Sequence, residues 1–342
     1  LLPLKKDIRT LAVIGPNADN GYNMLGDYTA PQADGSVVTV LEGIRQKVSK
    51  DTRVLYAKGC AVRDSSRTGF ADAIEAARSA DVVVMVVGGS SARDFSSEYE
   101  ETGAAKVSAN RVSDMESGEG YDRATLHLMG RQLELLEEVR KLGKPMVLVL
   151  IKGRPLLMEG VIQEADAILD AWYPGMQGGN AVADVLFGDY NPAGRLTLSV
   201  PRSVGQLPVY YNTKRKGNRS RYIEEAGTPR YPFGYGLSYT MFSYIGMKVR
   251  VSEESNHCRV DVSVTVRNQG TVDGDEVVQL YLRDEVGSFT TPDRQLRAFS
   301  RVRLKAGETR EITFTLDKKS LALYMRDGEW AVEPGRFTVM AG

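Results

Sequence analysis

The sequence predicts an α/β domain with a mostly parallel sheet, followed by a smaller all-β sandwich. Its 342 residues correspond to about two domains, at roughly 150 residues for each. Short apolar runs alternate with helical segments up to residue 200, which is the pattern of a parallel sheet covered on both faces. From about Phe242 the apolar residues recur at every second position, as is typical of antiparallel sandwich strands.

We expect the α/β domain to span residues 1–200. Apolar or β-rich runs predict its strands at Thr10–Gly15, Arg53–Tyr56, Asp81–Gly89, Pro145–Ile151, Ala167–Trp172 and Arg195–Val200. Apolar residues at helical spacing predict helices at Val38–Val48, Phe70–Ala80, Leu128–Leu142 and Ala181–Phe187. Gly143 and Gly188 directly follow the last two helices, where glycine commonly ends a helix.

Residues 201–241 interrupt both patterns with prolines, glycines and aromatic residues, and we expect an irregular linker there. Regular structure returns over residues 242–342. Alternation with polar residues is clearest at Val260, Val262, Val264 and Val266. Turn signals such as Asn268–Gly270 separate the apolar runs, so this region is predicted to form the β-sandwich.

The composition excludes several classes of function. Lys and Arg number 44, as do Asp and Glu, so the chain lacks the basic surplus of a general nucleic-acid binder. The basic run Lys214–Arg221 is therefore expected to be a solvated surface. No apolar run approaches the roughly 18 residues of a membrane helix. Two cysteines and two isolated histidines do not make a zinc pattern, and neither a metal nor a cofactor is predicted.

Two short motifs are set aside for lack of the correct spacing. Gly15-Pro16-Asn17 follows a predicted strand but lacks the glycine spacing and the lysine of nucleotide-binding loops. Ser90-Ser91 also follows a strand, but the nucleophile-elbow pattern is absent. We expect an ordinary turn at the first motif and no serine hydrolase at the second.

The long segment 90–124 is the best candidate for a functional site. It follows the predicted strand Asp81–Gly89, and active groups of parallel sheets lie on loops beyond the carboxyl ends of strands. Connections of this length are usually functional or disordered. Its charged residues gather at Asp114, Glu116, Glu119, Asp122 and Arg123.

Glu119 stands out because it lies between Gly118 and Gly120, whose backbones would let a substrate approach closely. Crowding of carboxylates can raise the pKa of one member, which suits a general acid. The acidic spacing does not fit a calcium loop. From spacing alone, a plain acidic surface loop is as good an interpretation as a catalytic one.

Several longer stretches carry a family resemblance. They are Leu1–Leu4, Leu11–Asp19, Gly26–Tyr28, Ser117–Arg123, Ala171–Gly179, Asp184–Leu196, Pro232–Thr240 and Glu276–Leu282. With them the whole chain resembles the C-terminal two domains of a glycoside hydrolase family 3 enzyme, of the β-glucosidase and β-xylosidase group. The resemblance implies a six-stranded α/β sandwich followed by a fibronectin type III-like domain. It also implies a (β/α)8 barrel domain in cis, absent from this chain, that carries the Asp nucleophile.

The resemblance also assigns roles to residues of the loop. The family's acid/base Glu lies on the long loop of the sandwich domain, which implies this role for Glu119, with Glu116 in reserve. Asp122 and Arg123 are expected to organise the loop through an ion pair. The implied activity is that of an exo-acting, retaining β-glycosidase on terminal non-reducing β-linked sugars of oligosaccharides or glycosides. With one of two carboxylates missing, this chain alone should be inactive.

Three other expectations complete the prediction. Trp172 and Tyr173 could form a sugar platform, but their place at a strand end before Pro-Gly favours a packing role. An alternative for the whole chain is a stand-alone, non-catalytic module that binds carbohydrate or a partner. Export of many family members implies a periplasmic or extracellular location.

Overall fold

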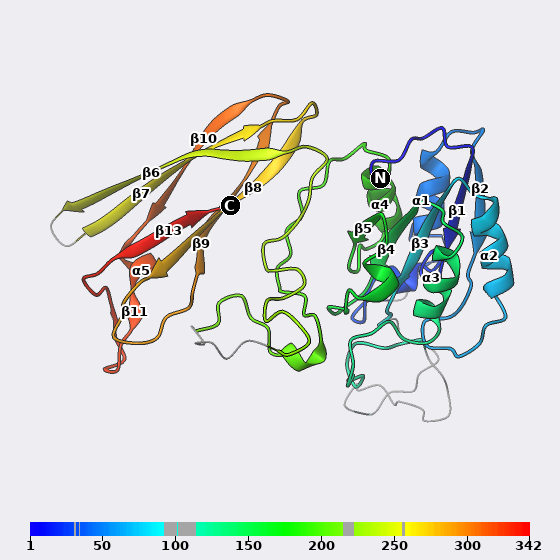
Figure 1. Cartoon of the computed structure of the whole chain (residues 1–342), viewed down its shortest axis with the longest axis horizontal. Helices are drawn as coiled ribbons and strands as arrows, with labels where there is room; N and C mark the ends of the chain where they lie inside the picture. Colours follow the sequence, from blue (N-terminus) through cyan, green and yellow to red (C-terminus); the bar gives the residue numbers. More distant parts are fainter. Residues whose placement is uncertain (31, 34, 92–100, 102–113, 215–221, 255–256) are drawn as a thin grey trace. The chain divides into compact units, whose positions relative to one another are not determined.

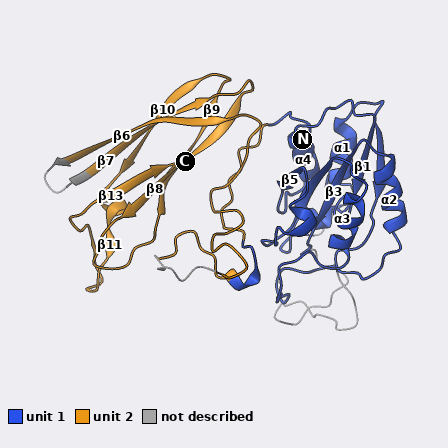
Figure 2. Cartoon of the chain, viewed as in Figure 1, with its two compact units in different colours: residues 1–190, 201–205 blue, residues 191–200, 206–342 orange. Residues whose placement is uncertain are grey.

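The chain forms two compact units (Figure 2), seen in a computed structural model that describes all residues except 31, 34, 92–100, 102–113, 215–221 and 255–256. Unit 1 comprises residues 1–190 and 201–205, and unit 2 comprises residues 191–200 and 206–342. The basic run at 214–221 therefore lies almost entirely outside the described residues. Both predicted fold classes are confirmed.

Unit 1 is built on a sheet of five parallel strands in the order β2-β1-β3-β4-β5 (Figure 1). The strands are β1 (Thr10–Ile14), β2 (Arg53–Ala57), β3 (Val82–Gly88), β4 (Met146–Ile151) and β5 (Ala167–Asp170). Every residue of β1 and β4 is buried, as expected of continuous apolar strands covered on both faces.

The sixth expected strand, Arg195–Val200, is not part of this sheet among the described residues. Its backbone bonds instead with the segment 231–235, which lies with it in unit 2. The amide of Leu196 donates to the carbonyl of Tyr235 (2.9 Å), and Val200 forms an isolated antiparallel bridge with Tyr231. The sheet therefore has five described strands where six were predicted.

Two pairs of helices cover the sheet, one on each face (Figure 1). They are α1 (Val40–Lys47), α2 (Phe70–Ser79), α3 (Gln132–Arg140) and α4 (Gly178–Leu186). On one face α1 and α4 approach closely, because a Cβ on Gly43 would overlap the carbonyl oxygen of Gly179. Thr39 and Glu42 start α1 with reciprocal side-chain to backbone hydrogen bonds, the arrangement of a capping box. Short 3-10 turns lie at η1 (Tyr22–Met24), η2 (Gly160–Ile162) and η3 (Val204–Gln206).

Unit 2 is an antiparallel sandwich of two three-stranded sheets, β10-β7-β6 and β13-β8-β9, with a small hairpin of β11 and β12. The elements are β6 (Phe242–Glu254), β7 (His257–Asn268), β8 (Gly274–Asp284), β9 (Gln295–Leu304), β10 (Thr309–Leu316), α5 (Lys318–Leu321), β11 (Leu323–Tyr324), β12 (Trp330–Ala331) and β13 (Phe337–Ala341). The alternating valines of β7 are all buried in its core. The predicted period of two is thereby confirmed.

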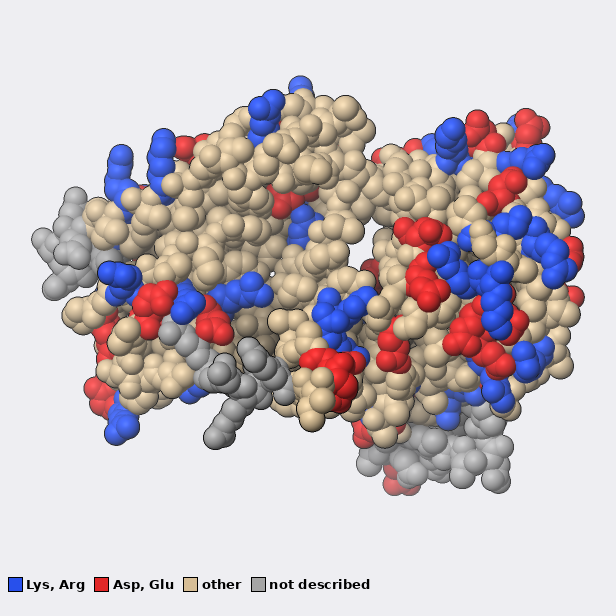
Figure 3. All heavy atoms as spheres, viewed as in Figure 1, with Lys and Arg blue, Asp and Glu red and all other residues tan. Residues whose placement is uncertain are grey.

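Surface charge in unit 1 is mixed. On the face in view in Figure 3, acidic and basic side chains of unit 1 lie interspersed, in keeping with the formal net charge of zero. None of the described helices has both the length and the apolar character needed to cross a membrane.

Candidate active site

The topology of unit 1 places the candidate loop at a favoured position for binding. The strand order 2-1-3-4-5 reverses direction between β1 and β3, and ligands of such sheets bind beyond the carboxyl ends of the strands at this switch point. Ser90 follows the end of β3 here. Its carbonyl accepts hydrogen bonds from the amides of Glu116 (2.7 Å) and Ser117 (3.2 Å). Residues 114–123 of the loop are thus attached to the switch point.

Asn17, at the end of β1, joins the strand ends together. Its side chain is fully buried, and Nδ2 donates to the carbonyls of Gly89 (3.0 Å) and Ile151 (3.3 Å). Its Oδ1 accepts from Asn23 Nδ2 (2.7 Å), and Asn23 Oδ1 accepts from Ser90 Oγ (2.6 Å). Buried polar groups that are satisfied in this way give a rigid, specific arrangement. The turn after β1 is therefore a structural support for the loop.

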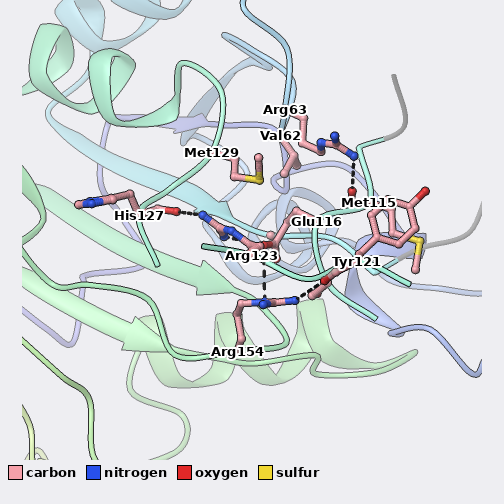
Figure 4. Close-up of polar contacts among 12 residues, drawn as sticks. Val62, Arg63, Met115, Glu116, Tyr121, Arg123, His127, Met129 and Arg154 are labelled. Carbon is pink, nitrogen blue, oxygen red and sulfur yellow. Dashed lines mark hydrogen bonds and ion pairs between the residues drawn. The ribbon is translucent and has the colours of Figure 1, made fainter. Parts of the chain in front are cut away.

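Asp114 serves as an anchor at the start of the loop. Its Oδ1 accepts from the amides of Val62 (3.1 Å) and Arg63 (3.2 Å). Arg63 Nη1 returns a bond to the carbonyl of Met115 (2.7 Å; Figure 4). The carboxylate is engaged by the backbone, and it holds residues 62–63 against the loop.

Glu116 is buried, with no exposed side-chain surface. Its Oε2 accepts from Arg123 Nη1 at 2.6 Å, and Arg154 Nε lies 3.8 Å away (Figure 4). Oε1 lies so close to Gly89 that a Cβ at that position would overlap it. Burial of a charge requires such pairing, so this carboxylate is placed as an internal anchor of the loop.

Arg123 organises the loop through Glu116, whereas the expected partner was Asp122. Its second terminal nitrogen, Nη2, donates to the carbonyl of His127 (Figure 4). Asp122 is exposed and has no ion pair among the described residues. The physical reason is that the buried carboxylate of Glu116 has lost its hydration and requires a paired cation. An exposed carboxylate remains hydrated and gains little free energy from an ion pair. Arg154 completes the arrangement by donating from Nη2 to the carbonyl of Tyr121 (3.0 Å).

Glu119 is exposed at the tip of the loop. Its amide donates to Asp27 Oδ2 (3.0 Å), and its Oε2 accepts from the Tyr28 hydroxyl (3.4 Å). Gly118 and Gly120 have φ of +109° and +82°, values that L side chains rarely adopt. A Cβ on Gly118 would also lie 2.7 Å from Asp27 Oδ2. The Gly-Glu-Gly sequence therefore lets Asp27 reach the loop backbone.

Asp27 and Tyr28 are site residues that sequence reasoning missed. They follow η1, far from the loop in the chain, and only their place in the resembling stretch Gly26–Tyr28 gave a signal. Tyr28 is 87% exposed although its ring is large and apolar. Its hydroxyl contact with Glu119 makes it part of the site.

A buried charge cluster lies at the ends of β4 and β5. Lys152 Nζ forms a 2.9 Å ion pair with Asp170 and lies 3.7 Å from the centroid of the Trp172 ring. Burial lowers the pKa of Lys152 and raises that of Asp170. Trp172 has φ of +55°, the one positive value among the described residues other than glycine. Its ring is thus in contact with a cation of unit 1, and the packing role expected for it stays a prediction.

Of the carboxylates in residues 114–123 of the loop, those of Glu119 and Asp122 are exposed. Asp114 and Glu116 are engaged by backbone amides and by arginine, respectively. No group of three or more His, Cys, Asp and Glu side chains in the described part of the chain is arranged to hold a metal ion. An exposed carboxylate can act as a general acid or base, and of the two exposed ones, that of Glu119 is held between Asp27 and Tyr28.

Comparison with known proteins assigns both parts of the chain to known families. Residues 1–239 match the glycosyl hydrolase family 3 C-terminal domain, and residues 276–342 match a fibronectin type III-like domain. A β-xylosidase of Formosa agariphila is 41% identical over the whole chain, and a periplasmic β-glucosidase of Salmonella typhimurium is 39% identical. A β-glucosidase of Listeria innocua, solved with glucose, is 32% identical with a TM-score of 0.83 and also matches the whole chain. In each case the chain covers 45% of the relative's length, so it spans about half of these proteins.

Proposed function

This chain belongs to glycosyl hydrolase family 3, and from that membership we propose that it supplies the general acid/base, Glu119, of a retaining β-glycosidase. The substrate would be an oligosaccharide or glycoside with a terminal, non-reducing β-linked sugar. The relatives named β-glucosidase and β-xylosidase support this class of substrate. The observation that carries the proposal is the exposed carboxylate of Glu119 on a loop fixed at the switch point of the sheet.

The accessibility of the two glutamates favours Glu119 over Glu116. A general acid must come within hydrogen-bonding reach of the glycosidic oxygen, about 2.6–3.2 Å between heavy atoms. The side chain of Glu116 has no exposed surface and is paired with Arg123. Glu119 is exposed, and its partners Asp27 and Tyr28 hold it from one side.

The proposed reaction needs a second carboxylate. Retaining glycosidases use two carboxyl groups about 5–5.5 Å apart, one as nucleophile and one as acid/base. In the proposed mechanism Glu119 protonates the leaving oxygen while an Asp attacks the anomeric carbon. Glu119 then removes a proton from water, and that water releases the sugar from the Asp. We place the Asp on a (β/α)8 barrel domain in cis, because this chain spans about half of its relatives.

Replacement of Glu119 by Gln in the complete natural protein tests the proposal. A glycoside with a poor alkyl leaving group needs protonation, so its turnover should fall about 10²–10⁴-fold. A dinitrophenyl glycoside needs little protonation, so its glycosylation step should be nearly unaffected. Glu116→Gln is the matched comparison, and it should act mainly on stability. Equal losses of kcat/KM, which reports the glycosylation step, on both substrates, or a leaving-group effect at Glu116 alone, would refute the assignment.

A further inference from the structure

The side chain of Tyr173 contacts both segments that hold Glu119. Tyr173 lies three residues beyond the end of β5, and its ring passes between two glycine backbones. A Cβ on Gly26 would lie 3.1 Å from the ring, and one on Gly153 would lie 2.6 Å from it. Gly26 directly precedes Asp27, the residue that accepts the hydrogen bond from the Glu119 amide. The ring thus supports the Asp27 segment.

The hydroxyl of Tyr173 contacts the second segment. It lies 2.9 Å from Ser117 Oγ, and either oxygen can donate the hydrogen bond. Ser117 is buried and stands two residues before Glu119. Its own amide is bound to the carbonyl of Ser90, so the serine is fixed at both its backbone and its side chain.

Trp172, which directly precedes Tyr173, has a strained backbone conformation held by Lys152. A positive φ at a tryptophan is strained, and it persists only where the surroundings impose it. Lys152 contacts Trp172 twice, because its amide donates to the Trp172 carbonyl (3.2 Å) and its Nζ lies over the Trp172 ring. Asp170 in turn holds Lys152 through the buried ion pair.

We propose that Tyr173 is a positioning residue for Glu119, holding the Asp27 segment with its ring and Ser117 with its hydroxyl. The inference rests on the proposed acid/base role of Glu119 and adds a residue through which that role is supported. A displacement of about 1 Å in a catalytic group can cost on the order of 10²-fold in rate. Two attachments to one rigid ring restrict such displacement of the carboxylate.

Tyr173→Phe tests the inference, because it removes the hydroxyl and keeps the ring. In the complete natural protein, kcat/KM for a methyl glycoside should fall about five- to tenfold, the effect of one lost hydrogen bond. The kcat/KM for the dinitrophenyl glycoside, which needs little protonation, should fall less. Ser117→Ala should reproduce this selectivity, and the double variant should be no worse than either single one, because both remove the same bond. Tyr281→Phe, which removes a buried hydroxyl bonded to Gln279 in unit 2, is the control and should leave both rates unchanged.

Amide hydrogen exchange provides a readout that does not depend on catalysis. Residues 117–121 should exchange faster in Tyr173→Phe, whereas β3 and β4 should be unchanged. If Glu119→Gln is selective for leaving group but Tyr173→Phe and Ser117→Ala are not, the inference is wrong while the proposed function stands. If Glu119→Gln is not selective, the proposed function fails, and the inference fails with it. Unchanged exchange at 117–121 would likewise overturn it.

Discussion

The backbone amide of Glu119 donates a 3.0 Å hydrogen bond to Oδ2 of Asp27, a residue 92 positions earlier in the chain. This contact joins the segment after β1 to the loop after β3, which are the two connections that flank the switch point of the sheet. A backbone bond to the residue itself fixes its Cα position, while its side chain stays exposed. A residue held in this way is restricted in its displacement, as the proposed acid/base role requires.

Replacement of Asp27 by Ala should lower kcat strongly while the melting temperature changes little. Loss of this hydrogen bond lets the backbone of Glu119 move, and a displacement of about 1 Å in a catalytic group can cost on the order of 10²-fold in rate, so kcat on poorly activated glycosides should fall roughly 10- to 100-fold. Asp27→Asn retains an accepting oxygen and should recover most of the activity. Asp7→Ala, at an exposed residue, is the control. Thermal melts should shift little in all three. The idea fails if Asp27→Asn is as impaired as Asp27→Ala.

Replacement of Gly118 by Ala should reproduce the catalytic defect of Asp27→Ala. The new Cβ would lie 2.7 Å from Asp27 Oδ2, at a φ of +109°, so either the loop or the aspartate must move. Gly143→Ala is a matched control, because it has φ of +66° and open space around the new Cβ. Both changes should cost about 1–3 kcal/mol of backbone strain, measured by urea unfolding. Only Gly118→Ala should lower kcat, and equal activity of the two variants would argue against the steric account.

The fold was predictable wherever the signal was local. The run Met146–Ile151 is apolar at every position, and it forms a strand buried on both faces. The segment Arg195–Val200 alternates apolar and polar residues just as a strand does, but its hydrogen-bond partners lie at 231–235. Pairing with one segment or another is a long-range choice, and periodicity contains no information about it.

For the candidate site, the glycine flanks and the family resemblance pointed to Glu119, whose role stays a prediction. Its contacts Asp27 and Tyr28 lie on a different connection and were missed. The partner of Arg123 was expected at the adjacent Asp122, whereas burial of Glu116 determines the pairing. Burial is a property of the folded chain, and the order of charged residues in the sequence does not show which carboxylate will be buried.

The thiol of Cys60 should be unreactive in the native protein. Its ionisation in the unfolded chain should also lower the free energy of unfolding at alkaline pH. Burial, aided by the nearby Asp114 carboxylate, raises the pKa of Cys60 to about 12, from an ordinary value of 9.0. Between these values the unfolded chain loses a proton that the folded chain keeps, so the free energy of unfolding decreases as pH rises through this window. The free energy of unfolding, measured with urea, should decrease less between pH 8 and pH 10.5 for Cys60→Ala than for the unaltered protein.

The reactivity of the thiol provides a second measurement. In a Cys258→Ala background, a disulfide reagent should react with Cys60 only on unfolding, and rapid reaction of the native protein at pH 8 would contradict the burial.

Replacement of Arg123 by Ala should strongly destabilise unit 1. It leaves the carboxylate of Glu116 buried with only Arg154 Nε nearby, at 3.8 Å, and loss of one partner of a buried pair typically costs about 3–5 kcal/mol. The double variant Arg123→Ala with Glu116→Gln removes the unpaired charge, and it should recover part of the loss. Arg78→Ala breaks an exposed pair with Glu75 inside α2 and should cost less than about 0.5 kcal/mol. The free energies of unfolding of the unaltered protein, the two single variants and the double variant are to be measured with urea. A double variant less stable than Arg123→Ala would mean that the Arg123 side chain stabilises the loop by packing and not by neutralising Glu116.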